Sequence, residues 1–161
     1  MTLTSSYDDH STPQTLEDEL AEILGALRLR GRQARAVAAR LGWNGEAPRT
    51  LAAAAAPEGY SRERVRQLEE RVRRQGPVGG HRFTATKAAL RLIEDATPIA
   101  ARDAAQRLSA AGVSRRPFNV AGLLSAAEIL GVEHSLEQQD GVLLSRRATA
   151  PGDYTLGGAA A

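Results

Sequence analysis

The chain has 161 residues, which is enough for one ordinary domain or two very small ones. It contains no cysteine, which excludes disulfides, thiolate metal sites and cysteine nucleophiles. With two Phe, one Trp and three Tyr, any core must be built mainly from Leu, Val, Ile and Ala. The polar, acidic N-terminus is unlike a signal peptide, and no apolar segment approaches the length of a membrane span, so we expect a cytoplasmic protein without a membrane partner.

The formal net charge of +2 conceals an uneven distribution along the chain. Residues 1–24 carry six acids and no Lys or Arg, whereas residues 25–93 carry fifteen bases against five acids. Residues 94–161 carry six bases against eight acids. A basic middle between acidic ends indicates a polyanionic partner for the middle. Nearly all the bases are Arg, which suits bidentate contact with phosphate or guanine, although a GC-rich genome would enrich Arg, Ala and Gly together in the same way.

In chain order, residues 1–14 are polar and rich in turn-forming residues, and we expect them to be disordered. Thr15 has the side chain of a helix N-cap and precedes an apolar stripe, and Gly31 is expected to end that helix. A second helix is predicted over residues 32–41. Residues 42–48 then form a loop, because they contain an Asn-Gly turn signal.

Thr50 starts a third helix, which Pro57 must stop, because proline lacks the N–H and clashes within a helix. Ser61 is the expected N-cap of a fourth helix, which fades by Gln75. The apolar residues of this helix recur at i, i+3 and i+7, which is one stripe of an α-helix: Val65, Leu68 and Val72. Every other position of residues 62–75 is charged or an amide.

The Gly- and Pro-rich stretch of residues 76–82 is the clearest break in this pattern, and it predicts a linker. It separates a first unit at residues 15–75 from a second unit at residues 83–147. Residues 148–161 are rich in Gly and Ala, and we expect them to be disordered.

The second unit is predicted to contain three helices followed by one β-hairpin. The expected helices cover about residues 85–95, the segment from Pro98 to just before Gly112, and a segment from the Asn119 cap to Leu130. The dipeptide Asp140-Gly141 fits the two-residue turn of a hairpin between short strands. Three helices and a hairpin follow one another in a winged helix, so the sequence predicts a mainly α fold with a small winged-helix-like unit.

The run Thr50-Leu51, followed by Ser61-Arg-Glu-Arg-Val-Arg-Gln-Leu-Glu69, resembles region four of bacterial sigma factors. Arg40-Leu-Gly-Trp-Asn-Gly45 is similar to the loop that precedes the helix-turn-helix of that family. The resemblance covers about residues 20–75. It implies a helix-turn-helix that reads the −35 promoter element in double-stranded DNA, together with contact to the flap of RNA polymerase.

By this resemblance, four residues occupy the positions that meet base edges: Arg62, Glu63, Arg66 and Gln67. The two arginines could donate to guanine O6 and N7, the glutamate could accept from cytosine N4, and the glutamine suits adenine or a thymine neighbourhood. Six further residues are better placed for phosphate, which gives affinity without sequence information: Arg49, Ser61, Arg64, Arg71, Arg73 and Arg74.

The sequence departs from the family pattern at two places. Ala52–Ala56 stands where the family has a polar, acidic helix, and Pro57 should shorten that helix. Glu58 stands where the family prefers an apolar residue. No part of the chain resembles sigma region two, which opens the −10 element, so we do not expect a self-sufficient sigma factor.

These observations predict a nucleoid-associated bacterial DNA-binding protein that regulates transcription, with RNA polymerase, a sigma factor or a second copy of the chain as further partners. Glu69–Arg73 and Glu70–Arg74 are i, i+4 pairs, which usually mark a solvated helix face. One alternative is therefore a protein-interaction module that binds polymerase or a sigma factor without reading DNA. Another is a nucleoid or DNA-defence protein with little sequence preference.

The last predicted helix of the second unit, residues 119–130, carries no base and one acid. Phosphate would repel that acid, so we expect this unit to pack against the first or to bind protein. No histidine has a ligand at metal spacing, and we find no nucleophile or nucleotide-binding motif. The sequence therefore predicts no cofactor, no metal and no catalysis.

Overall fold

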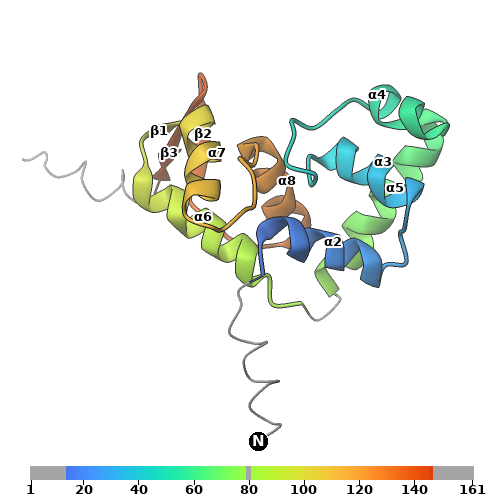
Figure 1. Cartoon of the computed structure of the whole chain (residues 1–161), viewed down its shortest axis with the longest axis horizontal. Coiled ribbons are helices and arrows are strands. Elements are labelled where there is room, and N and C mark those ends of the chain that lie inside the picture. Colours follow the sequence, from blue (N-terminus) through green and yellow to red (C-terminus); the bar gives the residue numbers. More distant parts are fainter. Residues whose placement is uncertain (1–13, 79–80, 147–161) are drawn as a thin grey trace, which may run out of the picture.

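The computed structural model describes residues 14–78 and 81–146, which form a mainly helical protein with one small β-sheet (Figure 1). The segments predicted to be disordered, residues 1–14 and 148–161, lie outside this range except for Gln14. None of the described helices is both long and apolar enough to cross a membrane. The described residues form seven α-helices: α2 (Leu16–Ala26), α3 (Arg32–Leu41), α4 (Leu51–Ala55), α5 (Arg62–Gln75), α6 (Thr84–Ala96), α7 (Ala101–Ala110) and α8 (Val120–Leu130).

Helix α2 begins where the sequence predicts and ends earlier. Thr15 is its N-cap, and the Thr15 Oγ1 atom accepts a hydrogen bond from the Asp18 amide at 3.2 Å. The helix ends at Ala26, and the prediction that it continues to Gly31 is wrong. The chain turns at Arg28, which has a positive φ of 66°, and Leu29 then enters the core, where it is 2% exposed. The helix therefore ends where the chain turns to bring Leu29 into the core, a tertiary contact that the local pattern does not indicate.

Helices α3, α4 and α5 agree with the predicted pattern and pack against one another. Pro57 does shorten the helix before it, because α4 gives way to a 3-10 turn, Ala56–Glu58. Gly59, with a φ of 74°, reverses the chain, and Ser61 caps α5 by accepting a hydrogen bond from the Arg64 amide at 3.1 Å. The three helices share a small core with short side chains: Ala36, Ala54, Ala55 and Val65.

The remaining helices are combined with a three-stranded antiparallel sheet. Its strands are β1 (Ile99–Ala100), β2 (Leu136–Gln139) and β3 (Val142–Ser145), in the order β1–β3–β2. The predicted hairpin is confirmed, because Asp140 and Gly141 have positive φ angles of 51° and 78°, as a two-residue turn between strands requires.

One predicted helix start is wrong. Pro98 does not open a helix; it precedes the short strand β1, and α7 begins at Ala101. The two residues of β1 pair with Leu143 and Val142 of β3. This pairing joins segments that are far apart in the sequence, so the local pattern could not reveal it.

A single cluster of buried residues includes residues from both sides of the segment 76–82. Leu68 of α5 belongs to it together with Ile93 of α6 and Leu123 of α8. Figure 1 shows α8 between the α3–α5 helices and the α6–α7 helices, and α8 contacts α3, α5, α6 and α7. The second unit therefore packs against the first, which is one of the outcomes that its sequence led us to expect.

The acidic first turn of α2 also joins the two parts of the protein. The carboxylate of Glu19, which is 5% exposed, accepts hydrogen bonds from the Ala85 amide at 2.8 Å and from the Thr86 amide at 2.9 Å. Helix α6 has no side-chain cap of its own, so Glu19 supplies the acceptor that the start of this helix needs. Two further acids of this turn contact the segment 115–116: Glu17 and Asp18.

Candidate nucleic-acid interface

Helix α5 has one buried stripe, and the rest of its surface is polar. Val65, Leu68 and Val72 are at most 1% exposed, and α5 contacts α3, α4 and α8. Every other position of the helix carries a charged or amide side chain. Because the buried stripe fixes the rotation of the helix about its own axis, it also decides which side chains face solvent.

The four residues predicted to meet base edges lie together on the exposed side of α5. Arg62, Glu63, Arg66 and Gln67 occupy positions i, i+1, i+4 and i+5 of the helix, which are neighbours on one face. All four are exposed. The structure therefore brings the whole predicted base-reading set onto one accessible surface, which we call the α5 face.

Ion pairs along the helix orient the α5 face. Arg66 Nη2 lies 2.7 Å from Glu63 Oε2, and Arg66 Nη1 lies 3.3 Å from Glu70 Oε1. The side-chain hydrogen bond from Arg66 holds the pKa of Glu63 below its ordinary value, and the same bond raises the pKa of Arg66. About half of each side chain is exposed, 51% for Arg66 and 59% for Glu63, so these pairs stabilise the fold little and can be exchanged for contacts with a ligand.

The side chain of Arg62 differs from its neighbours on this face. It makes no hydrogen bond or ion pair with another described residue, and it is exposed in the first turn of α5. A free guanidinium at the start of the helix keeps all its donors available. It is the residue of this face that a ligand can engage without breaking an internal contact.

The residues predicted to contact phosphate are placed less uniformly. Arg73 and Arg74 are exposed in the last turn of α5, where each pairs with the glutamate four positions earlier. Arg49 is exposed just before α4, and Arg64 is half-buried on a different side of α5 from the base-reading residues. Arg73 and Arg74 therefore continue the α5 face at its C-terminal end, seven positions after Arg66 and Gln67, whereas Arg64 lies off this face and Arg49 lies outside α5.

Two members of the predicted phosphate set already have a structural role. The Ser61 hydroxyl oxygen accepts the hydrogen bond that caps α5. Arg71 Nη2 donates to the backbone carbonyl oxygen of Leu27 at 2.7 Å, which satisfies an acceptor just beyond the end of α2. A phosphate contact from Arg71 would require this bond to be shared or broken.

An ion-pair network holds α5 against α3. Arg40 Nε donates to Glu69 Oε1 at 2.9 Å, and Arg40 Nη1 donates to the carbonyl oxygen of Arg49 at 3.0 Å. Glu69 also pairs with Arg73, and its side chain is only 12% exposed. Burial raises the pKa of Glu69, whereas hydrogen bonds from Arg40 and Arg73 lower it. The hydrogen bonds outweigh burial, so the pKa of Glu69 lies below the ordinary value of 4.5. Sequence reasoning missed this role of Arg40, because its partner lies 29 positions away.

Hydrogen bonds from arginines of α3 hold the turn between α4 and α5. The carboxylate of Glu58 accepts hydrogen bonds from Arg35 Nε at 3.1 Å and from Arg35 Nη2 at 3.0 Å. Arg32 donates to the Glu58 carbonyl oxygen at 3.2 Å, and its guanidinium lies 5.2 Å from the ring centroid of Tyr60. Two arginines of α3 therefore hold this turn, which leads into α5.

Comparison of the chain with protein-family models, with curated proteins and with solved structures finds no match. Among the residues that the structure describes, no three His, Asp or Glu side chains come together as metal ligands. What this region can do chemically follows from its own geometry. It presents guanidinium donors, carboxylate acceptors and an amide on one face of a firmly anchored helix.

Proposed function

We propose that the protein binds double-stranded DNA in a sequence-specific manner, with α5 in the major groove, and that it regulates transcription in bacteria. The observation that carries this proposal is the α5 face, where two arginines, a glutamate and a glutamine are exposed side by side. A major groove admits one α-helix, and these side chains match the edges of guanine, cytosine and adenine. The buried stripe of α5 supplies the rigid support that such a helix requires.

The order of elements supports the same proposal. Helix α4, a short turn and α5 follow one another as in a helix-turn-helix, and Thr50 and Ser61 cap the two helices. In the second part, the order α6, β1, α7, α8, β2, β3 suits a small winged-helix-like unit. The resemblance of residues 50–69 to sigma region four adds a reason to propose promoter DNA as the target.

A second candidate function is favoured by the charges at the centre of the α5 face. Glu63 and Glu70 flank Arg66 and pair with it, so the middle of the face is close to neutral. A face of this kind can also dock on a protein surface without reading DNA. RNA polymerase and sigma factors are the partners that this candidate implies.

The test is a selection of duplexes from a random pool, followed by fluorescence anisotropy at several salt concentrations. We expect an enriched sequence, and we expect log K to fall linearly with log salt by about 0.9 for each phosphate that the protein neutralises. The double variant Arg62→Ala/Arg66→Ala should bind the enriched and random duplexes almost equally, because each lost bidentate contact removes roughly tenfold discrimination.

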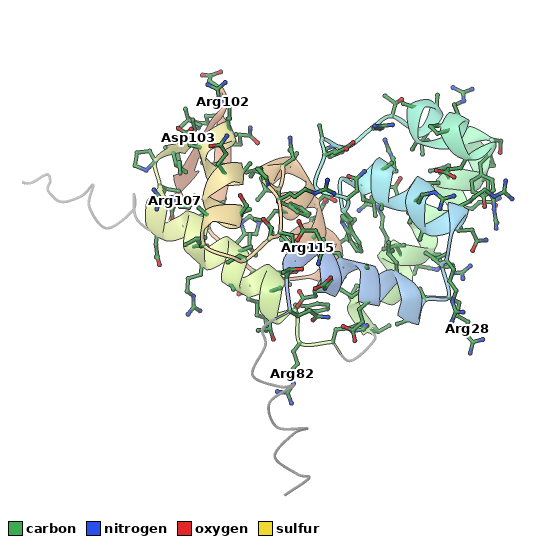
Figure 2. All side chains as sticks on the ribbon, in the orientation of Figure 1. Arg28, Arg82, Arg102, Asp103, Arg107 and Arg115 are labelled. Atoms are coloured by element: carbon green, nitrogen blue, oxygen red, sulfur yellow. The ribbon has the colours of Figure 1, made fainter. Side chains whose placement is uncertain are left out.

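The matched control is Arg102→Ala/Arg107→Ala, which removes the same charge from α7. Figure 2 shows both of these arginines on the opposite side of the molecule from α5. This variant should keep the preference for the enriched duplex. No enriched sequence, together with retention of RNA polymerase on the immobilised protein, would instead support the protein-interaction candidate.

A further inference from the structure

A cleft of about 520 Å³ is lined by residues of α2, α3 and α4, by the loop after α3, by the turn after α4 and by the segment 115–116. Its floor is apolar and is formed by residues of α2, of α3 and of the loop that follows α3: Leu20, Leu24, Ala34, Ala38 and Trp43. The volume is in the range of sites that hold small molecules, roughly 300–1,000 Å³. Small side chains on α3 leave this space open.

Arginines line the rim of the cleft. Four of its residues are arginines that come from three different segments of the chain: Arg35, Arg49, Arg115 and Arg116. Figure 2 shows Arg115 beside the start of α2. Arg35 and Arg115 are engaged with Glu58 and Asp18, and Arg49 pairs with Glu46. The side chain of Arg116 is exposed and makes no hydrogen bond or ion pair with another residue in the described part of the chain.

The two acids that line the cleft are already satisfied. Glu17 accepts hydrogen bonds from the amides of Arg115 at 2.9 Å and Arg116 at 3.3 Å. Glu58 is bound by two guanidinium nitrogens of Arg35. The cleft therefore combines an apolar floor with a rim whose acids all have hydrogen-bond partners, and among the described charged side chains that line it only the Arg116 guanidinium has no partner.

The geometry points to a binding site for a small amphipathic anion, whose apolar body lies on the floor and whose carboxylate meets Arg116. A carboxylate there would form a charge-assisted hydrogen bond with a guanidinium whose donors are unused. A cation would lie beside this guanidinium and meet no acid without a partner among the described lining residues, and a fully polar anion would leave the apolar floor in contact with water. This inference goes beyond the proposed function, because it requires no DNA.

A tryptophan in the cleft provides an intrinsic fluorescence probe for this site. Trp43 is the only tryptophan, it lines the cleft, and it is 3% exposed. Its Nε1 atom has no hydrogen-bond partner among the described residues, so packing alone holds the ring. A ligand that fills the cleft should therefore change the tryptophan fluorescence of the whole protein.

The experiment is a fluorescence titration of the full chain, without DNA, with decanoate below its micelle concentration and with decanol as the uncharged probe of equal chain length. We expect a saturable change with decanoate and about tenfold weaker binding of decanol. Arg116→Ala should lower the affinity for decanoate by about tenfold and leave the affinity for decanol unchanged. Arg107→Ala on α7 should change neither affinity.

A second variant, Ala34→Leu, fills the floor without changing the charge. It should abolish binding of both probes while the circular dichroism spectrum stays that of the wild type. The inference is overturned by equal affinity for decanoate and decanol, by a change with decanoate that never saturates, or by an Arg116→Ala variant that binds decanoate like Arg107→Ala. None of these outcomes depends on DNA binding, so the proposed function is tested separately.

Discussion

Helices α5 and α8 occupy equivalent places in the chain, and they have opposite environments. Each is the last of three successive helices, α3–α5 in one part and α6–α8 in the other. Helix α5 buries three of its fourteen residues, whereas α8 buries seven of its eleven. The side chains of α5 outside its buried stripe are charged or amides, whereas α8 carries one charged residue, Glu128. Of these two helices, only α5 exposes a polar face to solvent.

The difference shows that helix order does not decide which helix can approach a ligand. Helix α8 lies between the two sets of helices, and it meets α3 so closely that a Cβ atom at Gly122 would clash with the carbonyl oxygen of Gly42. Helix α5 contributes its apolar stripe to the shared core and keeps the α5 face in solvent. One helix therefore serves as the centre of the protein, and the other presents a surface.

The largest effect should come from Gly122→Ala, which tests whether α8 is fixed by its contact with α3. The added methyl group meets backbone that cannot move aside, so we expect a loss of about 3 kcal/mol in the free energy of unfolding, measured with urea. Gly25→Ala in α2 is the matched control, because no atom lies within 4 Å of the new methyl group. Gly25→Ala should stabilise the protein by roughly 0.5–1 kcal/mol. If the free energy of unfolding changed in the same direction in both variants, the enclosed position of α8 would be contradicted.

The next effect should come from Glu19→Gln, which tests the connection between α2 and the start of α6. The carboxylate accepts three hydrogen bonds in a buried site, and an amide replaces one acceptor oxygen by a donor. We expect a loss of about 2 kcal/mol in the free energy of unfolding. Glu22→Gln, an exposed position of the same helix, should change stability by less than about 0.5 kcal/mol. Equal losses in the two variants would show that Glu19 does not hold α6.

A smaller effect, on specificity, separates the two helices directly. If α5 meets base edges, Glu63→Ala should lower the preference for cytosine at one position of the selected duplex by roughly tenfold, measured by competition anisotropy. Glu128→Ala removes the single acid of α8 and should leave all preferences unchanged. If only the α8 variant lost its base preference, α8 and not α5 would be the helix that reads DNA.

The smallest effect should be a pH dependence of the support behind α5. The pKa of Glu69 is depressed in the folded protein, so its contribution to stability is present above pH 4.5 and is lost as the pH falls through the folded value. Glu69→Gln should therefore cost about 1 kcal/mol at neutral pH. Its unfolding curve should approach that of the wild type in acid. A difference that does not change with pH would exclude ionised Glu69 as the partner of Arg40.

Local chemistry was enough to predict most helix starts, and the long-range contacts were not predictable. Thr15, Thr50, Ser61 and Asn119 cap the helices that the sequence assigns to them, because an N-cap bonds to an amide two or three residues ahead. The end of α2 and strand β1 were mispredicted, because each depends on a partner far away in the chain. The predicted base-reading residues share a face, whereas Arg71 and Arg40 have partners that no local pattern shows.

Local spacing and side-chain chemistry, which act over a few residues, account for the period of α5, its buried stripe, the composition of its exposed face and the turn of the hairpin. The enclosed position of α8, the acids of α2 that hold the second part in place and the Arg-rimmed cleft beside α3 could be found only in the folded protein. These features depend on contacts between segments that are distant in the chain. Close packing and the need to satisfy buried polar groups select such contacts, and neither requirement leaves a periodic mark in the sequence.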